Sequence, residues 1–200
     1  MDRIMIINGS PRAPKSNSRQ YAAILSRSCR KPADYFQISR NNHLEICSQM
    51  EHYTDVVFVF PLYADSLPVV LLNFLKFLED HPPRQKPVLS ILINCGFLEY
   101  SQNEVAVQMM KLFCRQNGYR TGSILMLGGG EAILKTPFKG IAVRIIRKLA
   151  RSIDQKQYRT LQTTMPLTKR LFIWASTIYW TRYGKRNGIG KKEMQTPVIS

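Results

Sequence analysis

The sequence predicts an α/β fold in which a mostly parallel sheet of five strands is covered by helices on both faces. Short apolar runs alternate along the chain with stretches in which apolar residues recur every three or four positions. The chain has 200 residues, of which 44% are hydrophobic, enough to bury one sizeable core. Because parallel strands need right-handed crossovers, the helices between them must cover both faces, so we expect a three-layer sandwich.

Five short runs of aliphatic, aromatic and β-branched residues predict the strands. They are residues 3–7, 34–38, 55–60, 87–94 and 122–130. The run 55–60 is apolar at every position after Asp55, which is typical of a strand that is covered on both faces.

Four stretches with helical spacing lie between or after these strands. Asn17 or Ser18 is placed to cap the first helix, and Pro68 suits the first turn of the second. Ser101 and Glu104 have capping-box spacing at the start of the third. The buried stripes expected for the four helices are Tyr21, Ile24 and Leu25; Leu71, Phe74, Leu75 and Leu78; Ala106, Met109, Met110 and Phe113; Ile141, Ile145, Leu149 and Ile153.

Four loops follow the predicted strands at the edge where parallel sheets bind ligands, beyond their carboxyl ends. They read "NGSPRAPKSNS" (8–18), "PLYADSLP" (61–68), "NCGFLEYS" (94–101) and "GGGEA" (128–132). All four are richer in small, polar or aromatic residues than a connection requires. We therefore expect a ligand site at this edge.

The loop 8–18 has the composition of a phosphate-binding loop. Hydroxyls and backbone N–H groups at a helix N-terminus face a partial positive charge that favours an anion. Arg12 or Lys15 can add a charge-assisted contact. The loop lacks both the Walker ending and the dinucleotide G-x-G-x-x-G pattern, so the phosphate is expected to belong to a mononucleotide. The alternative is an ordinary turn followed by an N-cap.

The set of motifs "GSPR" with "SNS", "PLYADSLP" and "NCGF" resembles the NAD(P)H-dependent FMN reductase branch of the flavodoxin-like proteins, over about residues 3–155. The resemblance implies a flavodoxin-like sandwich with strand order 2-1-3-4-5. It implies that the FMN phosphate is held by Ser10, Arg12, Ser16, Asn17 and Ser18. It places around the isoalloxazine Pro61, Leu62, Tyr63, Ala64, Asp65, Asn94, Cys95, Gly96 and Phe97.

The chemistry of a flavin agrees with these positions. Tyr63 or Phe97 offers a flat aromatic neighbour for the ring, and backbone groups near Gly96 can face its polar edge. For Cys95 we expect the backbone, rather than the sulfur, to matter. Because the flavin itself accepts hydride, no catalytic side chain is expected.

The resemblance implies an NAD(P)H oxidoreductase that passes electrons from the flavin to a quinone, free flavin or another small-molecule acceptor, and that forms a homodimer. The alternative is a non-catalytic FMN-binding electron carrier or redox-sensing module.

The net charge of +16 implies attraction to anionic partners. Much of this charge lies toward the C-terminus, and we divide the chain into an FMN-binding domain (1–158) and a basic extension (159–200), partly helical. In the extension, "TKRLFIWASTIYWTRYGKRNG" (168–188) combines aromatic residues with basic ends. Three interpretations stay open: a helix packed on the core or in a homodimer, a helix at an anionic membrane surface, or a nucleic-acid patch, which is the least favoured.

The cysteines indicate neither a metal site nor a disulfide framework. Cys29, Cys47, Cys95 and Cys114 have no metal-ligand spacing. We expect reduced, mostly buried thiols in a cytoplasmic protein, peripheral to a membrane at most, since no apolar run reaches the ~18 residues of a membrane span.

Overall fold

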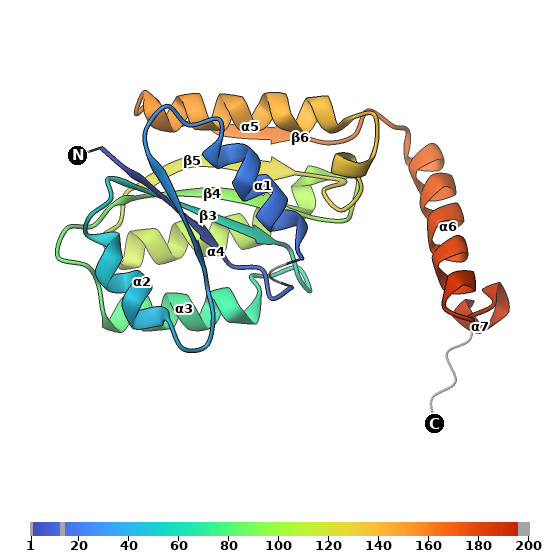
Figure 1. Cartoon of the computed structure of the whole chain (residues 1–200), viewed down its shortest axis with the longest axis horizontal. Coiled ribbons are helices and arrows are strands. Elements are labelled where there is room, and N and C mark those ends of the chain that lie inside the picture. The colour runs from blue at the N-terminus through green and yellow to red at the C-terminus, as the bar shows by residue number, and fades with distance from the viewer. Residues whose placement is uncertain (1, 13–14, 196–200) are drawn as a thin grey trace. The chain divides into compact units, whose positions relative to one another are not determined.

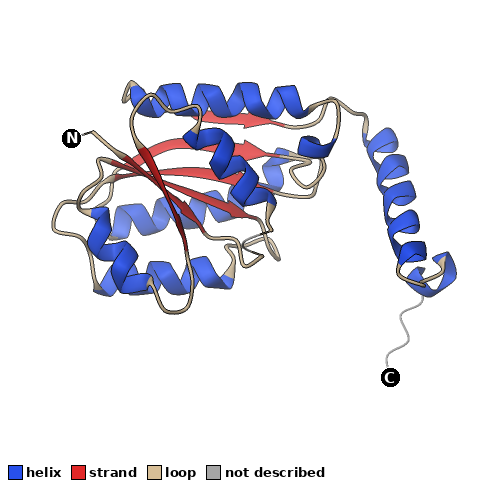
Figure 2. Cartoon of the chain, in the orientation of Figure 1, coloured by secondary structure: helices blue, strands red, loops and turns tan. Residues whose placement is uncertain are grey.

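The computed structural model describes residues 2–12 and 15–195 of the chain. These residues belong to two compact units, Met1–Met165 and Pro166–Ser200. The first unit is a three-layer α/β sandwich, with its strands between two layers of helices (Figure 2). The second unit is helical. The α/β prediction is therefore confirmed.

The sheet of the first unit is parallel throughout, with strand order β2-β1-β3-β4-β5-β6. The order of the first five strands is the predicted one, but the sheet has six strands rather than five. The strands are β1 (Ile4–Asn8), β2 (Ala33–Gln37), β3 (Asp55–Pro61), β4 (Val88–Asn94), β5 (Thr121–Leu127) and β6 (Thr160–Thr163).

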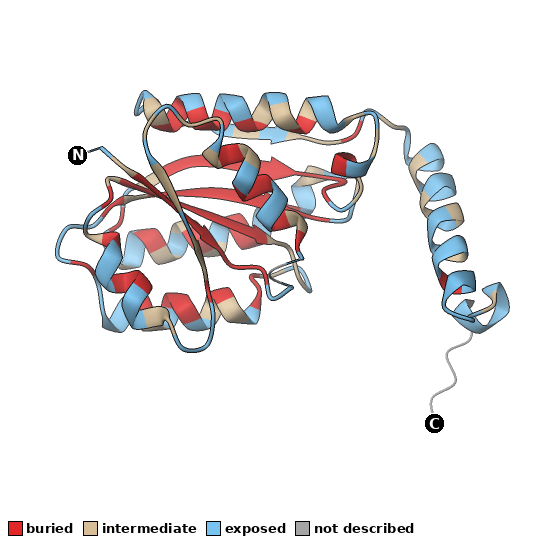
Figure 3. Cartoon of the chain, in the orientation of Figure 1, coloured by how far each residue is buried: buried red, intermediate tan, exposed pale blue. Residues whose placement is uncertain are grey.

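The additional strand β6 pairs with β5, with Ile124 opposite Thr160 and Leu127 opposite Thr163. It lies within residues 159–200, which the sequence assigns to the extension. Its side chains alternate between exposed and half-buried positions, so it lacks the apolar run that marks the other strands (Figure 3). Periodicity over four polar residues is too weak to predict a strand.

The helices cover both faces of the sheet, as expected for parallel crossovers. On one face α1 (Asn17–Ser26) and α5 (Lys139–Asp154) pack against each other (Figure 1). The opposite face is covered by α2 (His43–Met50), α3 (Val69–Asp80) and α4 (Glu104–Gln116). Helix α2 has no counterpart among the predicted helices, because its eight residues span little more than two turns.

The strand side chains alternate between these two layers, and both sets are buried. Met5 and Ile7 of β1 belong to the cluster beneath α2, α3 and α4. Ile4 and Ile6 project to the other face and are equally inaccessible, as the two-residue period of a strand requires. Burial on both faces explains why the central strands are almost continuously apolar.

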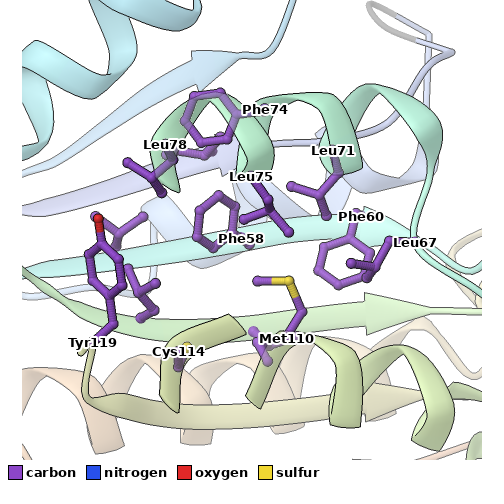
Figure 4. Packing of buried hydrophobic residues seen from close by; sticks show 14 of the residues in the cluster. Phe58, Phe60, Leu67, Leu71, Phe74, Leu75, Leu78, Met110, Cys114 and Tyr119 are labelled. Atoms are coloured by element: carbon purple, nitrogen blue, oxygen red, sulfur yellow. The ribbon is translucent and has the colours of Figure 1, made fainter. Parts of the chain in front are cut away.

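Helix α3 supplies the main apolar surface beneath β3 (Figure 4). The ring of Phe74 lies 6.1 Å from that of Phe58, centroid to centroid, at an interplanar angle of 57°. Leu71, Leu75 and Leu78 line the same helix face at the predicted spacing. This packing holds the carboxyl end of β3 at the edge of the core, where the loop 61–68 begins.

Two helix starts differ from the expected ones. The N-cap of α1 is Ser16, one residue before the predicted candidates, and its hydroxyl accepts a hydrogen bond from Arg19 N at 3.1 Å. Ser101 does not cap α4, because it lies in a 3₁₀ turn, η1 (Tyr100–Asn103), and α4 begins at Glu104. The Asn103 amide donates to Tyr100 O at 2.9 Å within that turn.

The second unit contains α6 (Lys169–Arg186) and α7 (Lys191–Gln195). Thr168 caps α6, its hydroxyl accepting from Leu171 N at 3.3 Å. The predicted helical segment in residues 168–188 is therefore confirmed. Within the described part of the chain, no helix combines the length and the apolar character needed to cross a membrane.

Candidate functional site

The loop after β1 is held by its own side chains and by β2. Asn8 Oδ1 accepts from Ser10 N at 2.9 Å, and the Ser10 hydroxyl accepts from Arg12 N at 3.4 Å. Gln37 Nε2, at the end of β2, donates to Asn8 O at 3.0 Å and to Ser10 O at 3.3 Å. These bonds hold the backbone of Asn8 to Arg12 at the start of the loop.

The end of this loop forms the N-terminus of α1. The hydroxyl of Ser16 satisfies the N–H of Arg19. The N–H groups of Asn17 and Ser18 precede the first hydrogen bond of the helix, and the positive end of the helix dipole lies there. The side chain of Arg12 is exposed, and residues 8–19 include no Asp or Glu. The arrangement suits an anion.

The side chain of Ser18, one of the predicted phosphate ligands, contacts Asn94. The hydroxyl of Ser18 is buried and accepts from Asn94 Nδ2 at 3.3 Å, so it faces the sheet. Asn94 Nδ2 also donates to Phe60 O at 3.1 Å. The side chain of Asn94 thus joins the start of α1 to the ends of β3 and β4.

The loop after β3 makes a tight turn at the same edge of the sheet. Leu62 N donates to Asn94 O at 2.8 Å, and Tyr63 and Ser66 exchange backbone hydrogen bonds of 3.2 and 2.9 Å. Ala64 and Asp65, between them, are left-handed, with φ of 45° and 55°. Such conformations cost of order 1–2 kcal/mol in a non-glycine residue and concentrate at functional sites.

The loop after β4 buries Cys95 and exposes the two residues that follow it. Cys95 N donates to Leu127 O at 3.0 Å, which continues the sheet pairing. The thiol lies 3.4 Å from Asn103 Nδ2 and within reach of the Phe97 carbonyl. Burial raises the pKa of the Cys95 thiol, so the thiol is a packed group rather than a nucleophile. The side chain of Phe97 is 53% exposed.

The glycines of the loop after β5 bring it against the loop after β4. Gly129 N donates to Phe97 O, and Gly130 N donates to Cys95 O at 2.7 Å. A Cβ atom on Gly130 would lie 2.7 Å from Asn94 Cβ, so this close approach requires glycine. The run of three glycines in the sequence is the signal for such contact.

Two residues outside the predicted site tie α1 to this last loop. Tyr21, buried in α1, donates its hydroxyl to Gly130 O at 2.6 Å. Glu131 accepts through its backbone O from Asn17 Nδ2 at 3.3 Å, and its side chain borders Gly96. In the sequence, Tyr21 has the spacing of an ordinary buried residue of a helix. Its hydrogen bond to Gly130 becomes apparent only in the tertiary structure.

The structure therefore brings the predicted residues of loops 8–18, 61–68 and 94–101 to one edge of the sheet, the carboxyl edge. The ends of β3 and β4 and the start of α1 are cross-linked there through Asn94. The exposed residues of this edge include Arg12 and Lys15, Ala64 and Asp65, Gly96 and Phe97, and Glu131.

The cysteines and acidic residues of the described ranges form no metal-binding group. Among residues 2–12 and 15–195, no three His, Cys, Asp or Glu side chains are grouped so that they could hold a metal. The four cysteines are free thiols, and burial raises the pKa of Cys47 to about 11 and that of Cys29 to about 12. These thiols are protonated at neutral pH.

Comparison with known proteins identifies the fold. No protein-family model matches the sequence, and no curated protein does. Solved structures do match, and they show that the first unit has the flavodoxin-like fold.

Three of the similar structures illustrate the range of this fold. The Trp repressor binding protein from Bacillus subtilis has a TM-score of 0.61 and 14% identity, covering 73% of this chain and 99% of its own. A flavodoxin from Streptococcus pneumonia TIGR4 has a TM-score of 0.58 and 12% identity, covering 77% and 99%. An FMN-dependent NADH-azoreductase from Bacillus anthracis, solved in complex with FMN, has a TM-score of 0.58 and 15% identity, covering 77% and 100%.

Proposed function

We propose that this protein is an FMN-dependent NAD(P)H oxidoreductase, whose site is the carboxyl edge of the sheet in the first unit. The observation that carries the proposal is the N-terminus of α1. It presents the first N–H groups of the helix in a serine-rich, carboxylate-free loop beside Arg12. The same edge exposes an aromatic side chain at Phe97, which a phosphate-only site would not need.

The donor set of the loop after β1 fits a nucleotide monophosphate. The dianion would meet the backbone N–H groups of Asn17 and Ser18, the hydroxyls of Ser10 and Ser16, and the guanidinium of Arg12. Ser10 and Ser16 are held in place, since each hydroxyl accepts a backbone N–H at 3.4 and 3.1 Å respectively. A hydroxyl that accepts one bond still has its own hydrogen to donate to the phosphate.

The two neighbouring loops fit the ring of a flavin. Tyr63 is half-buried and Phe97 half-exposed, so each offers an aromatic surface at the rim of the site. The backbone of Gly96, which has no side chain of its own, can approach the polar edge of the ring. The left-handed turn at Ala64 and Asp65 is exposed beside Tyr63, and its peptide groups would be available to the same edge.

Bound FMN would supply the redox chemistry, as the acceptor of hydride from a nicotinamide nucleotide. The residues of this chain would hold the phosphate, orient the ring and leave one of its faces open to the nicotinamide and then to a small acceptor such as a quinone or free flavin. No acid–base side chain is assigned. The name of the NADH-azoreductase neighbour, which has the same fold, supports a nicotinamide donor.

The proposal is tested by titrating the protein with FMN and following the flavin absorbance, with Arg12→Glu as the variant. Arg84→Glu is the matched control, because Arg84 is also exposed but lies in the loop before β4, at the opposite edge of the sheet. We expect Arg12→Glu to weaken FMN binding about tenfold or more, which corresponds to about 1.4 kcal/mol, and Arg84→Glu to leave it unchanged.

Steady-state oxidation of NADH and NADPH by the FMN-loaded protein, with a quinone as acceptor, tests the enzymatic part. Turnover supports an oxidoreductase. A yellow protein that oxidises neither nucleotide would instead be an electron carrier, which the likeness to a flavodoxin fold accommodates. A protein that binds no FMN would refute both functions.

A further inference from the structure

Helix α6 exposes large apolar side chains along most of its length. Residues 171–181 include no charged side chain. In this segment and the turn that follows, the exposed fractions reach 62% for Trp174, 53% for Ile173 and 47% for Trp180. Leu171, Tyr179 and Tyr183 are also exposed. So many exposed apolar groups on one helix indicate an interaction surface.

The aromatic residues gather toward the C-terminal half of α6. The rings of Tyr179 and Trp180 lie 5.2 Å apart, those of Trp180 and Tyr183 5.9 Å, and those of Tyr179 and Tyr183 6.4 Å, measured between centroids. At about 100° per residue, these three side chains share a sector of about 100° with Phe172. Trp and Tyr combine an apolar ring with a polar N–H or O–H, the combination suited to a boundary between hydrocarbon and water.

Positive charges lie at both ends of the uncharged segment. Lys169 and Arg170 precede it, and Arg182, Lys185 and Arg186 follow it. In the described part of the second unit, the only acidic residue is Glu193.

Helix α7 adds charge to the C-terminal end of α6. The chain reverses at Gly188, which has a φ of 76°, and Glu193 caps α7 by accepting from Gly190 N. Gly184 of α6 is buried against Met194 of α7. The reversal therefore brings Lys191 and Lys192, in the first turn of α7, back beside the end of α6.

The N-terminal cations of α6 are electrostatically unfavourable in the isolated helix. Lys169 and Arg170 lie in the first turn, at the positive end of the helix dipole. The charge pattern of the helix thus indicates an anionic partner at each end, with an apolar partner between them.

We propose that α6 lies in the surface of an anionic lipid bilayer, parallel to it, with the sector of Phe172, Tyr179, Trp180 and Tyr183 at the boundary between headgroups and acyl chains. Its terminal Lys and Arg contact anionic headgroups. An interfacial helix with aromatic residues and flanking cations binds in this way. The uncharged segment, residues 171–181, is about 16 Å long, half of what a membrane span requires.

The other partners fit less well. A second copy of α6 would bring two strongly cationic helices together, so like charges would oppose the pairing. Nucleic acid would match the cations and could stack on the rings. It would not, however, bury exposed aliphatic side chains such as Leu171 and Ile173. An anionic bilayer interface can contact cationic, aromatic and aliphatic side chains together.

The protein carries its own probe, because its only two tryptophans, Trp174 and Trp180, both belong to α6. The full-length protein is mixed with phosphatidylglycerol vesicles or with phosphatidylcholine vesicles, and both tryptophan emission and co-sedimentation are measured. We expect phosphatidylglycerol alone to shift the emission to shorter wavelength and to sediment the protein. Added salt should weaken the binding.

Two sets of substitutions separate the action of α6 from that of general positive charge. The triple variant Arg182→Gln, Lys185→Gln, Arg186→Gln should weaken vesicle binding by about a hundredfold. The control removes the same charge from exposed positions of the first unit, with Lys76→Gln, Arg84→Gln and Arg115→Gln, and should have a much smaller effect. Trp180→Gln should weaken binding, which co-sedimentation measures. Circular dichroism verifies that every variant is folded.

Three results would overturn the proposal. The first is tryptophan emission that phosphatidylglycerol vesicles leave unchanged, or equal effects of the two triple variants. The second is an emission shift that appears without vesicles and follows protein concentration and dimer formation, which would assign α6 to a second copy of the chain. The third is tighter binding to duplex DNA than to the vesicles, with the same dependence on Arg182, Lys185 and Arg186.

Discussion

The substitution Gly128→Ala tests the packing that holds the site together. Gly128 is the first glycine of the loop after β5, and its N–H donates to Thr163 O of β6 at 2.9 Å. A Cβ atom placed there would collide with the carbonyl oxygen of Leu98. It would also lie 2.9 Å from the Thr164 hydroxyl and from Tyr100 N. Because two of these atoms belong to backbone, the loops after β4 and β5 must separate to admit a methyl group.

The expected cost follows from these contacts. Overpacking of this kind costs about 1–3 kcal/mol, and weakening the hydrogen bond between Gly128 and Thr163 adds about 1 kcal/mol. We therefore expect the free energy of unfolding to fall by about 2–4 kcal/mol. With a urea m-value of about 2 kcal/mol/M, the midpoint of urea unfolding should decrease by about 1–2 M.

The control is Gly140→Ala. Gly140 lies in α5, and a Cβ atom there would meet nothing within 4 Å. Alanine in a helix is favoured over glycine, so this variant should gain about 0.5–1 kcal/mol. Urea unfolding followed by circular dichroism measures both variants. A Gly128→Ala protein within 0.5 kcal/mol of the wild type would refute the contact between the two loops.

Two further predictions concern strain and pH. Ala64→Gly should raise the free energy of unfolding by about 0.5–1 kcal/mol, because glycine adopts a φ of 45° without strain. A lower thermal midpoint of the variant would show that the turn is not strained. The second concerns Cys47. Burial raises the pKa of its thiol from 9.0 to about 11 in the folded state, so the thiol ionises first in the unfolded chain. Its stabilising contribution is complete below pH 9 and is lost as the pH rises toward 11, by at most about 1.4 kcal/mol per pH unit. Cys47→Ala should flatten this part of the stability–pH curve, and an unchanged slope would contradict the assignment.

The strands β1 to β5 were predictable from strong local patterns, and their order from the resemblance to flavodoxin-like proteins. The run 55–60 is continuously apolar because β3 is buried on both faces. Once parallel strands are recognised, their carboxyl ends must share an edge, so the loops 8–18, 61–68 and 94–101 had to converge. The chemistry of each loop could then be read from its residues.

The features that were missed depend on tertiary contacts. Strand β6 has four residues and forms by pairing with β5, a partner that periodicity does not reveal. The hydroxyl of Ser18 faces Asn94 because α1 packs against the ends of β3 and β4, a relation that the spacing of either residue does not contain. Likewise, the bond from Tyr21 to Gly130 joins residues 109 positions apart.

The central claim, that the start of α1 holds the phosphate of a flavin mononucleotide, is tested most directly by comparing FMN with riboflavin, which is the same flavin without the phosphate. The dissociation constants of both are measured for the wild-type protein by fluorescence titration. Two lost charge-assisted hydrogen bonds correspond to about 3 kcal/mol, so riboflavin should bind about a hundredfold more weakly. Equal affinities for the two flavins would contradict a phosphate site at Ser10, Ser16 and Arg12.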